Sequence, residues 1–134
     1  MEPLHVLVVD DEPHIGRIIQ TKWEHGPFRV TLAYDGQQAL DALQRYNDVA
    51  LVVLDLMMPH LDGLGVLRRM RERDQWHRIP TVVLTAVGEE QYQREALGLG
   101  ANEFLTKPFS PKKLFQRVSE LAGAVTPGPA ARQP

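Results

Sequence analysis

The sequence predicts an α/β protein with a doubly wound, five-stranded parallel sheet in the order 2-1-3-4-5 and five helices. Five short apolar runs alternate with five amphipathic segments, and the 134 residues suit a single domain. Strict alternation favours parallel strands joined by right-handed crossovers. With so few strands, an open sheet is a better solution than a closed barrel.

The predicted strands cover residues 4–9, 30–33, 50–54, 81–84 and 104–106. The first, third and fourth are apolar almost without interruption. Such runs are typical of central parallel strands that helices cover on both faces.

The first predicted helix begins at Pro13, a residue favoured at the first helical position. Ile15, Ile18, Ile19 and Trp23 then recur at helical spacing, which predicts one stripe facing the core. The other helices are expected over residues 36–46, around Leu64 to Met70, over residues 91–99 and from Pro111 onward. The fourth of the five is the least apolar.

The predicted domain covers residues 1–122, because residues 123–134 lose all periodicity and are rich in Pro, Ala and Gly. The chain is 43% hydrophobic with a net charge of −2, so we expect no membrane partner and no direct binding of nucleic acid. It has no cysteine, no signal-peptide pattern and no apolar run long enough for a bilayer, so we expect a cytoplasmic protein.

Polar residues follow four of the predicted strands. Asp10 and Asp11 come after the first, Asp55 ends the third, Thr85 ends the fourth and Lys107 follows the fifth. The carboxyl ends of parallel strands meet at one edge of the sheet, so we expect these side chains to share one crevice.

Each of these residues alone has a structural explanation. Asp11 could cap the first helix, and Asp55 could be a turn residue. Thr85 could bond to backbone, and Lys107 could be a solvated surface lysine. Their coincidence at one edge is what favours a functional site.

Three clustered carboxylates need a cation between them if all are to stay ionised. The ligands are hard oxygens, which favours Mg²⁺, with Mn²⁺ as the alternative. A carboxylate nucleophile, a metal, an ammonium and a hydroxyl together indicate phosphoryl transfer.

The motifs VVDDEP, VVLDLMMPHLDG, VVLTA and EFLTKPF, in this order, resemble the receiver domains of two-component response regulators. The resemblance covers residues 4–122 and implies a flavodoxin-like fold. It implies a phosphoprotein switch that accepts a phosphoryl group from a sensor histidine kinase or a histidine phosphotransfer protein. Such a switch is no enzyme beyond catalysing its own phosphorylation and slow dephosphorylation.

The resemblance also implies a role for each residue. Asp55 would accept the phosphoryl group, and Mg²⁺ would be held by Asp10, Asp11, Asp55 and the backbone carbonyl of Met57. Lys107, Thr85 and the backbone N–H of Ala86 would bind the phosphate. The Lys107–Pro108 bond is expected to be cis.

Switching would begin when Thr85 moves toward the phosphate and Phe104 rotates into the space it leaves. The surface of the fourth helix, fifth strand and fifth helix would then bind a partner or form a homodimer. The alternative for Phe104 is a strand residue packed on the core. Met57 and Val87 flank the site and are apolar, so neither can orient a water, and we expect slow dephosphorylation.

Three other functions are compatible with a fold of this kind. A flavodoxin-like electron carrier would place its flavin phosphate where Asp10 and Asp11 repel it. A metal-dependent aspartyl phosphatase would usually have an Asp-x-Asp on its first strand, which this chain lacks. A non-phosphorylated pseudo-receiver would lack charged site residues that are all present here.

Overall fold

The computed structural model describes residues 3–24, 26–58 and 60–125. Its sheet contains, in spatial order, β2 (Phe28–Ala33), β1 (Leu4–Val9), β3 (Val49–Asp55), β4 (Thr81–Ala86) and β5 (Glu103–Lys107). Every neighbouring pair is parallel. The predicted order 2-1-3-4-5 is confirmed, and the strands start or end up to two residues from their predicted bounds.

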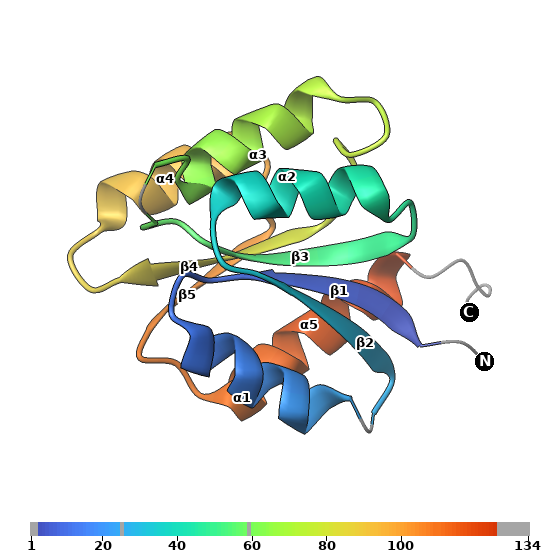
Figure 1. Cartoon of the computed structure of the whole chain (residues 1–134). Helices are drawn as coiled ribbons and strands as arrows, with labels where there is room; N and C mark the ends of the chain where they lie inside the picture. The colour runs from blue at the N-terminus through green and yellow to red at the C-terminus, as the bar shows by residue number, and fades with distance from the viewer. Residues whose placement is uncertain (1–2, 25, 59, 126–134) are drawn as a thin grey trace.

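Five helices alternate with the strands and cover both faces of the sheet (Figure 1). On one face lie α1 (Pro13–Trp23) and α5 (Pro111–Val125). On the other lie α2 (Gly36–Arg45), α3 (Gly63–Glu72) and α4 (Glu90–Gly98). Within the described ranges, no helix is long and apolar enough to cross a bilayer.

The two faces explain why β1 is apolar from Val6 to Val9. Val6 and Val8 pack into the core beneath α1 and α5, whereas Leu7 and Val9 pack into the core beneath α2 and α3. Side chains alternate along a strand, so a stretch that packs into an apolar core on both sides needs apolar residues in succession.

The predicted stripe on α1 is only partly correct. Ile19 and Trp23 are buried, but the Ile18 side chain is 45% exposed. Ile18 is about 100° around the helix from Ile19, which places it at the edge of the stripe rather than under it. It lines an open groove with Phe109 and Pro111.

Polar caps fix where two helices begin. Asp35 accepts a hydrogen bond from the backbone of Gln38 at the start of α2, and Asp62 accepts one from Gly65 at the start of α3. Capping side chains of this kind satisfy backbone donors that the first turn leaves free.

Gly63, the first residue of α3, lies directly against the end of β3. A Cβ atom there would collide with the backbone of Asp55 and Leu56, and the Gly63 N–H donates to the Leu56 carbonyl at 3.1 Å. Because glycine allows this close approach, α3 starts immediately beside Asp55.

Helix α5 continues to Val125, past the predicted domain boundary at Ala122. Residues 126–134 lie outside the described residues, so the predicted tail or linker stays a prediction.

Candidate functional site

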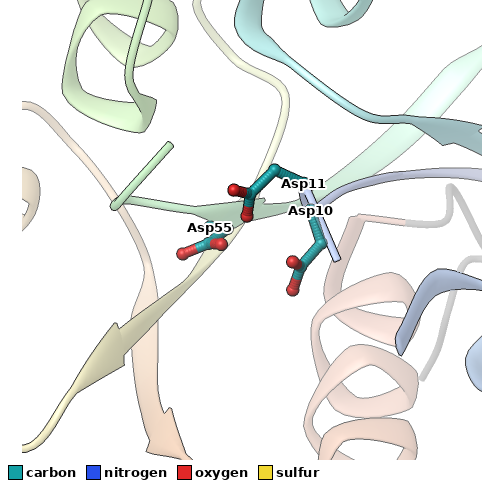
Figure 2. A group of neighbouring side chains, drawn as sticks. All are labelled: Asp10, Asp11 and Asp55. Atoms are coloured by element: carbon teal, nitrogen blue, oxygen red, sulfur yellow. The ribbon is translucent and has the colours of Figure 1, made fainter. Parts of the chain in front are cut away.

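The site lies where β1, β3, β4 and β5 end at one edge of the sheet. The structure brings Asp10, Asp11 and Asp55 together, with one carboxylate oxygen of each lying within 4.8 Å of the others. Figure 2 shows Asp10 and Asp11 coming from the end of β1 and Asp55 from the end of β3. Asp10 and Asp55 are 1% and 3% exposed, and Asp11 is the more open of the three.

Lys107 lies at the centre of this acidic group. Its Nζ is 2.9 Å from Oδ2 of Asp10, 2.9 Å from Oε1 of Glu12 and 3.1 Å from Oδ2 of Asp55. Burial opposes the charged lysine, but its close contacts with the carboxylates of Asp10, Glu12 and Asp55 outweigh that cost and raise the pKa of Lys107. The lysine therefore stays positively charged and is held by these carboxylates, and it is not a solvated surface group.

The surroundings of Asp55 disfavour its charged form, whereas those of Lys107 favour the charged lysine. Burial, with the nearby charge of Asp10, raises its pKa to about 7, although Lys107 and the Met57 N–H both favour the carboxylate. Met57 donates to Oδ1 of Asp55 at 3.1 Å. Asp55 is thus both a turn acceptor and a buried carboxylate that one lysine only partly compensates.

Asp10 offers an acceptor atom that the protein does not satisfy fully. Its Oδ1 accepts the Glu12 N–H at 2.9 Å. Its Oδ2 is buried and receives no aligned hydrogen bond from the described residues, although the charge of Lys107 is close. A buried carboxylate oxygen with spare capacity beside two further carboxylates fits a hard divalent cation.

Asp11 is not a helix cap. The residue before α1 is Glu12, whose side chain makes no capping hydrogen bond. The Glu12 side chain instead reaches Lys107, which lowers the pKa of Glu12. No role for Glu12 was predicted from the sequence, although its place directly after Asp11 was a usable signal.

Thr85 and Ala86 end β4 beside Lys107. The register pairs Ala86 with Lys107, and Thr85 with Thr106. The Thr85 side chain is 1% exposed, and its Oγ1 accepts a hydrogen bond from Nε2 of Gln93 at 2.9 Å. Its partner is thus a side chain of α4 rather than backbone, and no sequence pattern indicated Gln93.

Phe104 is 38% exposed, so it is not simply a residue packed on the core. The register pairs it with Val83, a member of the core beneath α2 and α3, so Phe104 lies on the same face as Thr85.

Two further predicted features of the site can be compared with the structure. The side chains of Met57 and Val87 are exposed by 44% and 79%. The Lys107–Pro108 bond is cis, as expected.

The raised pKa of Asp55 predicts a pH-dependent effect of Asp55→Asn on metal-free protein. The folded-state pKa exceeds the ordinary value, so the wild type loses stability as pH rises from about 4 to about 7. At about pH 8, chemical denaturation should give the variant a free energy of unfolding higher by about 1–4 kcal/mol, a difference that shrinks toward pH 4.

Asp48→Asn is the opposite-sign control. A hydrogen bond with His5 lowers the pKa of Asp48, so this variant should be less stable than wild type at neutral pH. An effect of Asp55→Asn on stability that does not change with pH would contradict the raised pKa of Asp55.

The comparisons with known proteins agree with this geometry. The sequence profile of the response regulator receiver domain matches residues 6–119. The response regulator SaeR of Staphylococcus aureus is 39% identical over 117 residues, which is 87% of this chain and 50% of SaeR. The chain thus spans about half the length of the curated relatives it matches.

Solved structures give the same result. The receiver domain of the Francisella response regulator 1452 superposes with a TM-score of 0.82 at 35% identity, covering 91% of this chain and 98% of that one. The receiver domain of Pseudomonas aeruginosa sensor histidine kinase PA1611, with magnesium coordinated in its active-site cleft, gives 0.80 at 29% identity, covering 90% and 98%. With the predicted sheet order and the carboxylates at its edge, these matches show that the chain belongs to the receiver domain family of two-component response regulators.

Proposed function

We propose that this receiver domain accepts a phosphoryl group on Asp55 from a phosphohistidine of a sensor kinase or phosphotransfer protein. The observation that carries the proposal is the buried Asp55 carboxylate, 3.1 Å from Lys107 and next to Asp10 and Asp11. An Asp55 oxygen would attack phosphorus, a P–O bond would form, and the P–N bond to the imidazole would break.

We propose Mg²⁺ as the cofactor, with Mn²⁺ able to replace it. Asp10, Asp11, Asp55 and the Met57 carbonyl would hold it, and the unsatisfied Oδ2 of Asp10 supports this assignment. When bound, the ion would neutralise charge on the carboxylates and the phosphoryl oxygens. The PA1611 receiver domain, which holds magnesium in its cleft, supports the same choice.

The surrounding residues would then bind the phosphoryl oxygens. Lys107 would give up its bonds to Asp10 and Glu12 and pair with the phosphoryl group, a stronger charge-assisted contact. The Thr85 hydroxyl and the Ala86 N–H would donate to the other oxygens. The chain would act on no separate substrate, so we classify it as a phosphoacceptor rather than an enzyme.

Intact-protein mass spectrometry with a small phosphodonor tests this function. Wild type should gain one phosphoryl mass in Mg²⁺ and none in EDTA, and Asp55→Asn should gain none. Asp74→Asn, which changes an exposed aspartate away from the site, is the matched control and should behave as wild type. A metal-independent adduct, or one that persists in Asp55→Asn, would refute the proposal.

Met57 and Val87 lead us to expect slow loss of the phosphoryl group. Both side chains are exposed and apolar, so neither can hold an attacking water by hydrogen bonding. Replacing Met57 with Asn or Val87 with Glu should shorten the phosphoryl half-life by about 3- to 30-fold, measured by phosphate release. Unchanged half-lives in both variants would show that these positions do not limit hydrolysis.

We propose a cytoplasmic location and an output through the surface formed by α4, β5 and α5. Leu97 and Phe104 are exposed on it. Phosphorylation would reorient Phe104 there and favour partner binding or a homodimer. Light scattering should then report a larger mass after phosphorylation, and an unchanged monomer would exclude the homodimer.

A further inference from the structure

The Thr85 hydroxyl is already engaged by α4. Gln93 donates to Oγ1 of Thr85 at 2.9 Å, and within the described ranges this is the only hydrogen bond of that hydroxyl. Asp55 receives its hydrogen bonds from Met57 and Lys107 instead. Among the described residues, the Thr85 oxygen is therefore hydrogen-bonded to α4 and not to the proposed phosphoacceptor.

Helix α4 has few other attachments. Ala96 is its one fully buried residue, and Tyr92 is half-buried against the core beneath α2 and α3. The Arg68–Glu95 ion pair that links it to α3 has both side chains about half exposed, and pairs of that kind stabilise little. The Gln93–Thr85 bond is thus a principal connection between this helix and the edge of the sheet.

The carboxyl end of α4 is held separately. Arg71 of α3 donates to the carbonyls of Leu99 and Gly100 at 2.7 and 3.1 Å, and Gly100 has a φ of 93° that ends the helix. Loss of the Gln93–Thr85 bond would leave these contacts in place, so it would free the body of α4 while its end stays anchored.

We propose that Gln93 is a positioning residue that holds Thr85 away from the phosphoacceptor and transmits phosphorylation to α4. The inference rests on the proposed function and adds the residue that links the site to the output surface. Once Thr85 turns to donate to a phosphoryl oxygen, its Oγ1 leaves the Gln93 amide, and the helix loses that contact. Because the bond exists only in the resting arrangement, removing it favours the phosphorylated arrangement.

The test is the equilibrium affinity for beryllium fluoride, a phosphoryl analogue, at saturating Mg²⁺, measured by calorimetry. Gln93→Leu removes the donor and leaves a side chain of similar bulk, and it should bind about two- to tenfold more tightly than wild type. Gln91→Leu changes the same residue type at an exposed position of α4, where the side chain makes no hydrogen bond to the described residues, and it should match wild type. Gln93→Met replaces Gln93→Leu if the latter fails to fold.

A second arm separates positioning from a general effect on stability. In a Thr85→Val background the Gln93→Leu change should have no effect on affinity, because the partner hydroxyl is already gone. Unchanged or weaker affinity in Gln93→Leu, with or without a lower Tm, would overturn the inference. So would an equal gain in the Thr85→Val background.

The same measurement distinguishes failure of the proposed function from failure of the inference about Gln93. If wild type binds no beryllium fluoride and gains no phosphoryl mass, the proposed function is wrong and the inference falls with it. If wild type binds the analogue and only the Gln93 result fails, the phosphoacceptor assignment stands without the role of Gln93.

Discussion

The pairing of one lysine with several carboxylates is the interaction on which the rest of this structure depends. Asp10 and Asp55 are almost fully buried at the edge of the sheet, where ionised carboxylates are costly unless a positive charge is close. Lys107 supplies that charge to both, and to Glu12, from a strand far away in the sequence. The parallel sheet makes this possible, because β1, β3 and β5 all end at the same edge.

The compensation is incomplete, and this gives the site its chemistry. The pKa of Asp55 is raised to about 7, and Oδ2 of Asp10 lacks an aligned donor among the described residues. In the proposed function, the site would accept a cation and a phosphoryl group when Lys107 exchanges its carboxylate partners for the phosphoryl oxygens. A site whose carboxylates were fully compensated by positive charge would have no unsatisfied oxygen for a cation.

The helices pack against the sheet to different extents, and this difference favours movement of α4. The core beneath α1 and α5 includes Trp23, Phe28 and Phe115, whose rings contact one another, so that face is closely packed. Helix α4 fully buries only Ala96, half-buries Tyr92, and is tied to the site through Gln93 and Thr85. The helix that costs least to move is therefore the one nearest the hydroxyl that we expect to move.

Strand order and the edge at which Asp10, Asp55 and Lys107 meet could be predicted, because apolar runs and their alternation with helices depend on local sequence. The contacts of Glu12 and Gln93 could not, since they depend on the rotamer and depth of a side chain across two elements. The exposure of Ile18 was missed because helical spacing defines a stripe but not its edge.

The most direct test of the proposed phosphorylation of Asp55 is to treat the protein with a phosphodonor and Mg²⁺, reduce the acyl phosphate with borohydride, and sequence the peptides by mass spectrometry. We predict homoserine at position 55 alone, and homoserine at any other aspartate, or at none, would contradict the assignment.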